Sequence, residues 1–341
     1  MTDLADPISI LAADPELASC AVAGVDACGE PGRTDPGSPA VPALSAVEGS
    51  PVEPPHPASL PSAPADDIAA AELTIIRARR GWIGIDTSEL WRFRELLYFL
   101  VWRDFKVRYK QTTLGVAWAV LQPLFNMVVF TIIFGRLAHI PSDGFPYAVF
   151  VFAGLLPWTF FSGGVNLAGL SLVNQQNLLT KIYFPRLFVP AASIGAGLVD
   201  MAISFGVYAV VLAFYRFVPS WQIVYLPFLI FLTVVATLGS GLLLAALTVS
   251  YRDFRFVIPF MTQAAMFISP VIYSVTIIPP RYDWLLALNP MAGIIDGYRS
   301  AILGKPWNLT TLGVSTLSSF AIFTYGLFYF RKTERKFADI A

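Results

Sequence analysis

The sequence predicts an all-α integral membrane protein with six transmembrane helices, an N-terminal amphipathic interfacial helix, and re-entrant periplasmic helices between spans five and six. Of its 341 residues, 56% are hydrophobic and only 13% are charged, and the mean hydropathy is +0.63. Soluble domains carry about 25% charged residues, so a water-soluble fold of this size would lack the polar side chains to cover its surface. Several apolar stretches also reach the ~20 residues that a helix needs to cross a bilayer.

The N-terminal part of the chain has a different composition from the rest. Residues 1–70 are rich in Pro, Ala, Gly, Ser and Asp and have no apolar period, which is typical of a disordered tail. Cys20 and Cys28 lie here, so no cysteine metal site or disulfide framework is available to the membrane region. The expected domains are the tail (1–70), a cytoplasmic segment with the interfacial helix (71–111), a six-span domain (112–337) and a cytoplasmic C-terminal end (338–341).

A basic amphipathic helix is expected just before the first span. Over Ser88–Gln111 one helical face is mostly basic and another is apolar. The first face, with Phe99 as the exception, carries Arg92, Glu95, Arg103, Lys106 and Lys110. Such a helix lies flat at a membrane surface, with Arg103, Lys106 and Lys110 toward the headgroups. The alternative is a packed helix of a small cytosolic domain.

Apolar length places six spans. They are expected at Val116–Phe134, Tyr147–Leu170, Leu187–Phe214, Ile223–Val249, Phe256–Tyr273 and Thr311–Phe330. Between the last two, residues 274–310 are interrupted by proline and glycine, so short re-entrant or interfacial helices are expected there. The clusters Gly195–Gly197 and Gly239–Gly241 are expected to let helices approach closely, more often in packing within the chain than in a dimer contact.

Lysine and arginine predict the orientation. They are concentrated before span one, between spans two and three, between spans four and five, and after span six. The opposite side holds fewer: Arg136, Arg216, Arg281, Arg299 and Lys305. The prediction is a multi-pass protein of the bacterial cytoplasmic (inner) membrane with both termini cytoplasmic.

Few residues suggest chemistry. Asp200 is the one clear ionisable residue inside a predicted span, and such residues are functional candidates by default. It has no partner carboxylate or histidine nearby in sequence, which favours a structural hydrogen bond between helices. No phosphate-binding loop and no histidine pair occur, so the chain is expected to be no enzyme and to bind no metal or cofactor. A net charge of zero argues against a nucleic-acid partner.

The segment Asn174–Arg186, on the cytoplasmic side, predicts a contact surface. It combines polar amides with apolar side chains at helical spacing and contains Pro185 near its end. A short exposed amphipathic helix suits a soluble partner; the alternative is a loop on the headgroups. The residues expected to make the contact are Leu178, Leu179, Lys181, Ile182 and Tyr183.

Four motifs resemble one family. WRDFKVRYKQTTLGVAWAVLQPL, NLLTKIYFPRLFVPAAS, YRDF and LNPMAGIIDGYRSAILG look like the type-2 ABC export permeases for polysaccharides and polyol phosphates, including O-antigen, the glycan of lipopolysaccharide, and teichoic acid. The resemblance covers about residues 90–337. It implies a homodimer paired with a separate ABC ATPase that binds ATP and Mg. It also places the coupling helix at about 174–183 and periplasmic gate helices at about 283–303. The expected gate residues, in these helices or just before them, are Pro279, Tyr282, Trp284 and Met291.

Aromatic side chains recur at helical spacing in three spans. Their electron-rich faces stack on the C–H faces of sugars, and neighbouring amides can bind hydroxyl groups. With the resemblance, this favours a channel lining; the alternative is aromatic residues that face lipid. The expected lining residues are Trp118, Gln122, Phe125, Trp158, Phe161, Phe256, Phe260, Gln263, Phe267 and Tyr273.

The function expected from these features is export of a lipid-linked polysaccharide or polyol phosphate by a permease subunit that an ATPase partner drives. Membrane lipids and a second copy of the chain are further expected partners. An exporter of drugs or small lipids is the alternative within the same fold. A membrane-bound glycosyltransferase or ligase is the alternative from another class, and it should show acids or histidines clustered at one interface, which the sequence lacks.

Overall fold

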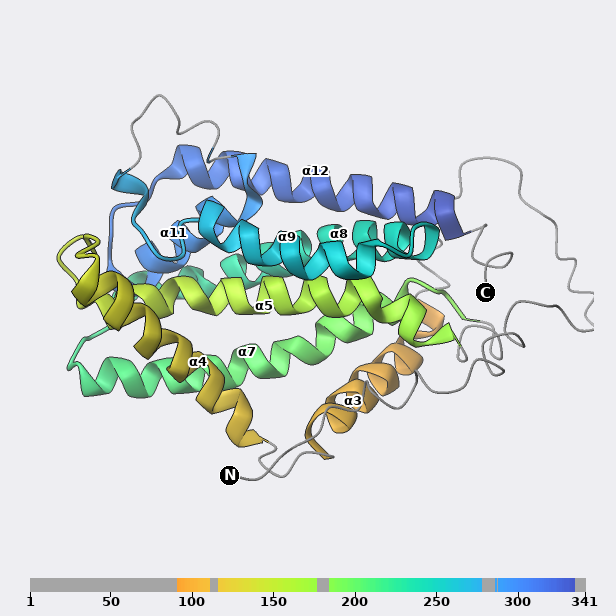
Figure 1. The fold of residues 1–341 in the computed structure, drawn as a ribbon, viewed down its shortest axis with the longest axis horizontal. Coiled ribbons are helices and arrows are strands. Elements are labelled where there is room, and N and C mark those ends of the chain that lie inside the picture. The colour runs from red at the N-terminus through yellow and green to blue at the C-terminus, as the bar shows by residue number, and fades with distance from the viewer. Residues whose placement is uncertain (1–90, 111–115, 177–183, 278–285, 287, 335–341) are drawn as a thin grey trace, which may run out of the picture. The chain divides into compact units, whose positions relative to one another are not determined.

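The structure, a computed structural model, describes residues 91–110, 116–176, 184–277, 286 and 288–334 (Figure 1). Within these residues the regular structure is helical and contains no strand. The helices are α3 (Arg94–Lys110), α4 (Val116–Phe130), η2 (Thr131–Leu137), α5 (Tyr147–Asn174), α7 (Phe188–Phe214), η3 (Trp221–Tyr225), α8 (Leu226–Ser250), α9 (Phe254–Ile268), η4 (Val275–Ile277), α11 (Pro290–Leu303) and α12 (Leu309–Glu334).

Five helical stretches in the described part of the chain are long and apolar enough to cross a membrane. They are Ala117–Leu137, Tyr147–Asn174, Phe188–Phe214, Trp221–Ser250 and Leu309–Glu334. The first joins α4 to the π-helix η2, and the fourth joins the 3-10 helix η3 to α8. These five agree with predicted spans one to four and six, each starting or ending a few residues from the predicted bound.

The predicted fifth span ends earlier than expected. Helix α9 stops at Ile268, and Ser269 adopts an extended conformation with φ −80° and ψ 144°. Pro270 follows Ser269, and a proline disfavours helical backbone in the residue before it. The predicted bound, Tyr273, was set by apolar length, whereas the proline ends the helix within its apolar stretch.

Helix α5 lies at the centre of the bundle and contacts α4, α7, α8, α9 and α11 (Figure 1). Its side chains are buried almost continuously from Ala148 to Trp158. A helix that is apolar on all sides is stable when neighbours cover every face. The largest cluster of buried apolar residues therefore forms around α5, with α7, α8 and α11 supplying most of the other side chains.

Helices α8 and α12 touch backbone to backbone. A Cβ atom added to Gly239 would lie 2.5 Å from the Cα of Phe323, and one added to Gly326 would lie 2.3 Å from the carbonyl oxygen of Gly239. In the other predicted cluster, a Cβ atom added to Gly195 would lie 2.8 Å from Cγ2 of Val101 in α3. Small residues permit such close approach in membrane bundles, so both glycine clusters serve packing within the chain, as predicted.

Helix α3 packs along the first half of α7. Leu100 is buried, and Phe93, Leu97 and Val101 pack around the same cluster, so this apolar side of α3 lies against other helices of the chain, whereas the prediction placed it at a membrane surface. Arg103, expected to face headgroups, donates hydrogen bonds to Asp104 and, at 2.6 Å, to Gln175 after the end of α5. The exposed side of α3 carries aromatic as well as basic side chains: Tyr98, Phe99, Trp102, Lys106, Val107 and Lys110.

Candidate functional site

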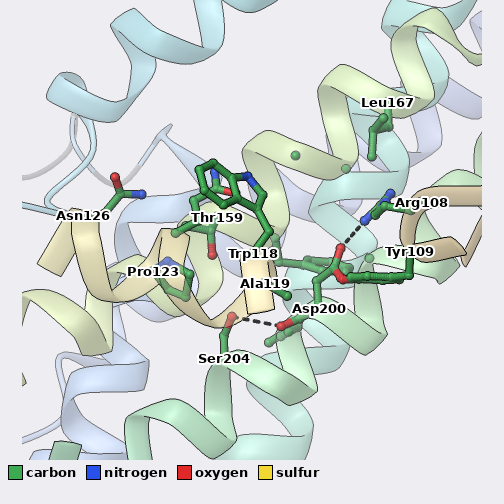
Figure 2. A pocket seen from close by; sticks show the side chains of 16 residues that line it. Arg108, Tyr109, Trp118, Ala119, Pro123, Asn126, Thr159, Leu167, Asp200 and Ser204 are labelled. Atoms are coloured by element: carbon green, nitrogen blue, oxygen red, sulfur yellow. Dashed lines mark hydrogen bonds and ion pairs between the residues drawn. The ribbon is translucent and has the colours of Figure 1, made fainter. Parts of the chain in front are cut away.

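A pocket of about 650 Å³ lies between the end of α3, the start of α4, and α5 and α7 (Figure 2). Small-molecule sites commonly have volumes of about 300–1,000 Å³, so the pocket can hold a ligand of that size. Three glycines, Gly163 and Gly164 of α5 and Gly197 of α7, form part of its wall. An added Cβ atom at Gly164 would lie 2.5 Å from Thr237 of α8, and one at Gly197 would lie 3.5 Å from Phe160 of α5, whereas one at Gly163 would meet no atom within 4 Å. Gly163 therefore leaves part of the pocket open.

Helix α4 directs one face into this pocket. Trp118, Gln122 and Asn126 follow one another at intervals of four residues and all line it. Four residues are close to one helical turn, so the indole and the two amides lie in a row. Within the described part of the chain, neither amide has a hydrogen-bond partner, so each keeps donors and an acceptor for a ligand.

Asp200 of α7 closes one end of the pocket. Its carboxylate accepts hydrogen bonds from the Arg108 guanidinium and the Tyr109 hydroxyl, both at the end of α3 (Figure 2). Ser204, one turn further along α7, donates to the Asp200 carbonyl oxygen at 2.9 Å. The acid thus bonds between helices, as its isolation in the sequence suggested. A carboxylate has about four lone-pair sites, and these two donors use two of them.

The four side chains on α9 that were expected to line a channel share an exposed face. Phe256, Phe260 and Phe267 are 82%, 74% and 54% exposed, and Gln263 is exposed beside them. The opposite face of α9 buries Ile258 and Thr262. On α4, Trp118 and Phe125 are also largely exposed. A row of exposed aromatic side chains on an apolar helix must meet lipid, a second protein chain or a ligand.

The expected aromatic stripe on the second span is placed differently. Trp158 is 3% exposed and lies in the central core, with Phe161 partly buried beside it. Trp158 therefore faces packed side chains of the same chain, and Phe161 does so in part. Burial in the single chain does not support a channel-lining position for Trp158. Tyr273 is partly buried after the end of α9, where its hydroxyl donates to the Ile268 carbonyl oxygen at 2.9 Å.

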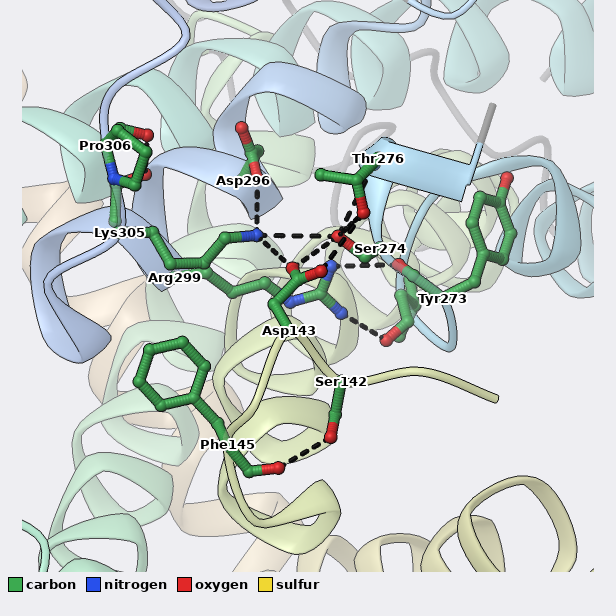
Figure 3. Close-up of polar contacts among 12 residues, drawn as sticks. Ser142, Asp143, Phe145, Tyr273, Ser274, Thr276, Asp296, Arg299, Lys305 and Pro306 are labelled. Carbon is green, nitrogen blue, oxygen red and sulfur yellow. Dashed lines mark hydrogen bonds and ion pairs between the residues drawn. The ribbon is translucent and has the colours of Figure 1, made fainter. Parts of the chain in front are cut away.

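A second polar cluster, absent from the sequence-based expectations, lies where α11 meets the loop after η2 and the turn after α9 (Figure 3). Lys305 donates to the Asp143 carboxylate at 2.5 Å and is 3.7 Å from that of Asp296. Ser274 and Thr276 also donate to Asp143, at 2.5 and 3.0 Å. Burial alone would raise the pKa of Asp143. Hydrogen bonds from Lys305 and Ser274, together with the charge of Lys305, outweigh burial and hold the pKa below its ordinary value.

Arg299 lies at the buried side of this cluster and is fully buried. Its guanidinium donates to the carbonyl oxygens of Tyr273 and Val271 at 3.0 and 2.7 Å, and lies 3.7 Å from the ring centroid of Phe150. Gly154 of α5 makes room for it, since a Cβ atom there would lie 2.9 Å from the guanidinium. Carbonyl groups freed by a broken helix need donors inside a membrane, and Arg299 supplies them to the turn after α9.

Sequence reasoning had counted Arg299 among loop charges. The available signal was the pair Asp296 and Arg299, three residues apart inside an otherwise apolar segment, because a charge pair within such a segment is typical of a buried network. Met291, expected at a gate, is buried in the central core. The remaining expected gate residues, Pro279, Tyr282 and Trp284, and the coupling residues Leu178, Leu179, Lys181, Ile182 and Tyr183, lie outside the described residues.

Comparison with known proteins gives one consistent family. Residues 95–303 match the ABC-2 type transporter family. An O-antigen export system permease protein RfbA from Myxococcus xanthus is 31% identical over 214 residues, which cover 62% of this chain and 82% of that protein. A protein of the same name from Klebsiella pneumoniae is 25% identical over 72% of this chain and 95% of its own. The polysialic acid transport protein KpsM of Escherichia coli is 25% identical over 59% of this chain and 78% of its own.

Proposed function

The chain belongs to the ABC-2 type transporter family, and we propose that it is the membrane-spanning permease subunit of an ATP-driven exporter of a lipid-linked polysaccharide. A polyol phosphate is the other substrate class consistent with the family resemblance. The observation that carries the proposal is the family match over residues 95–303, together with relatives named for O-antigen and polysialic acid export. Because the sequence contains no phosphate-binding loop, a separate ATPase subunit supplies the energy.

In the proposed transporter the chain crosses the membrane six times, with α9 as the fifth crossing. At 1.5 Å per residue, the 15 residues of α9 rise about 22 Å, less than the hydrocarbon core of about 30 Å. The residues after Ser269 carry the chain the remaining distance, with their carbonyl oxygens bonded to Arg299. Helix α11 then lies as a re-entrant element between the fifth and sixth crossings. An even number of crossings keeps both termini on the cytoplasmic side, in agreement with the distribution of Lys and Arg.

The proposal also includes a second copy of the chain. Almost no residue of α4 is buried within the chain, and α9 exposes its aromatic face. Two copies with two-fold symmetry can bring such faces together around a shared conduit. Phe256, Phe260 and Phe267 would then form a series of weak stacking sites for sugar rings, which suits a polymer that must bind and move on.

The proposed function is tested by export in a strain that lacks this chain. Wild-type protein, expressed with its ATPase, should restore the surface glycan. Leu179→Glu with Ile182→Glu, in the predicted coupling segment, should abolish export and release the ATPase during purification, because charges replace the apolar contact. Deletion of residues 1–70 is the control and should preserve both readouts. Failure of the wild-type protein to restore the glycan refutes the function, and export by the double variant refutes the coupling segment.

A further inference from the structure

We propose that the pocket between α3, α4, α5 and α7 binds a hydroxyl-rich sugar ring, the lipid-proximal sugar of the exported glycan, as the substrate is loaded. This inference rests on the proposed function and adds to it a loading site within one chain. The site differs from the exposed stripe of α9, which contributes no residue to the pocket.

The position of the pocket supports a ligand that enters from headgroup level. The apolar stretch Ala117–Leu137 has 21 residues, about the length that crosses the hydrocarbon core. Trp118 and Ala119, in its first turn, line the pocket, as do Arg108 and Tyr109 at the end of α3. Thr159 and Gly163, which also line it, are close to the middle of α5, and Asp200 is close to the middle of α7. The pocket therefore reaches from the membrane boundary at which α3 leads into α4 toward the middle of the bundle. By the distribution of Lys and Arg that boundary is cytoplasmic, the side on which an exporter collects its substrate.

The chemistry of the lining fits a neutral, hydroxyl-bearing ring better than a phosphate. Among the lining residues that the structure describes, full charges are carried by Arg108 and Asp200, which pair with each other. Gln122 and Asn126 supply donors and acceptors for hydroxyl groups, and Asp200 keeps lone pairs for further hydroxyl donors. Trp118 supplies an indole face on which the C–H groups of a sugar ring can stack. An apolar wall with a few convergent polar groups is typical of small-ligand sites.

Gly163 provides a way to fill the pocket without disturbing the bundle. It lines the pocket, and a Cβ atom added to it would meet no atom within 4 Å. Gly206 of α7 likewise has no atom within 4 Å of an added Cβ, but it does not line the pocket. Gly163→Leu and Gly206→Leu therefore form a matched pair, because each adds the same side chain to a helix in open space and each should raise helix propensity equally.

The first test compares export of the surface glycan by the two variants at equal membrane levels. Gly163→Leu should reduce the export rate at least ten-fold, because the leucine occupies the space of the ring, whereas Gly206→Leu should export like the wild type. Trp118→Leu and Gln122→Leu should each reduce export several-fold. Wild-type export by Gly163→Leu overturns the proposal. The proposed function is unaffected by that outcome, since it fails only when the wild-type protein does not restore export.

The second test detects occupancy and does not depend on export by a leucine variant. Cys20 and Cys28 are the only native cysteines, so Cys20→Ser with Cys28→Ser gives a thiol-free background for Gly163→Cys. A neutral maleimide should label Gly163→Cys rapidly in membranes from cells that make no glycan. Labelling should slow several-fold in membranes with accumulated lipid-linked glycan and an inactive ATPase. Equal labelling rates in the two membranes overturn the proposal. This holds also when both rates are slow, because ordinary lipid headgroups would then be what protects the thiol.

Discussion

Replacing Arg299 by methionine tests whether the buried guanidinium holds the turn after α9. Methionine has a similar length and no polar hydrogen, so the substitution removes the donors with little change in packing volume. It leaves the carbonyl oxygens of Val271 and Tyr273 without their Arg299 donors and removes the cation from the face of Phe150. Lys305 remains near Asp296, so that carboxylate keeps one cation.

The expected loss follows from those contacts. A buried acceptor left unsatisfied costs about 1–3 kcal/mol, and a desolvated cation–π contact contributes about 2 kcal/mol. Two acceptors and one ring contact give a loss of roughly 4 kcal/mol at the low end. Since 1 kcal/mol shifts the Tm of a domain of this size by about 2–4 °C, the Tm should fall by about 10 °C. Arg299→Lys keeps the charge but has one donor centre, so its Tm should fall by about half as much.

The assay is thermal unfolding of the purified complex in detergent, with Arg136→Met as the control. Arg136 is exposed and, like Arg299, lies on the side predicted to be extracytoplasmic, so its removal should shift the Tm by no more than ~2 °C. A shift of the same small size for Arg299→Met would refute the reasoning, because it would mean that water or another donor satisfies the two carbonyl groups.

Two further predictions concern exposed rings and an ion pair. Leucine at Phe256, Phe260 and Phe267 together should stop glycan export at normal membrane levels, while a single replacement slows it mildly; normal export by the triple variant would assign this face to lipid. Lys305→Met should lower the Tm by several degrees at neutral pH. The lowered pKa of Asp143 means that the pair stabilises the fold above the ordinary carboxyl pKa of ~3.9 and that this stability is lost as the pH falls through the lower folded value. The difference in Tm between variant and wild type should therefore shrink below about pH 4; a difference that stays constant would contradict the assignment.

The long helices could be predicted from sequence because each is encoded locally by a continuous apolar run. The bounds of α5 and α7 follow from such runs. The end of α9 was also encoded locally, by Pro270, but counting apolar residues up to Tyr273 passed over it. When an apolar run continues past a proline, the backbone preference of the residue before the proline decides where the helix ends.

The pocket and the Arg299 cluster could not be predicted because both depend on contacts between distant segments. Trp118 and Gln122 were identified as a pair at helical spacing, but the sequence does not show that Asp200, more than 70 residues later, closes the same pocket. Arg299 entered the sequence analysis only through the distribution of Lys and Arg. The carbonyl groups that it binds belong to a turn 26–28 residues before it, and the sequence does not show that contact. Spacing shows which residues share a helical face and leaves open which face meets which neighbour.

Polar and aromatic residues in the apolar helices have separate roles in this chain. Asp200 bonds to α3, Arg299 bonds to the turn after α9, and the Asn166 amide donates to Thr262 of α9 at 3.1 Å. Each of these bonds ties two elements of the same chain together, and each would be costly to break in a medium without water. The exposed rings of α4 and α9 make few contacts within the chain, and an aromatic face can exchange a lipid chain, a partner side chain or a sugar ring at little cost. Polar bonds inside the subunit can keep its fold fixed while the exposed aromatic faces change their contacts. If these faces meet the substrate as proposed, this separation suits the stepwise movement of a polymer.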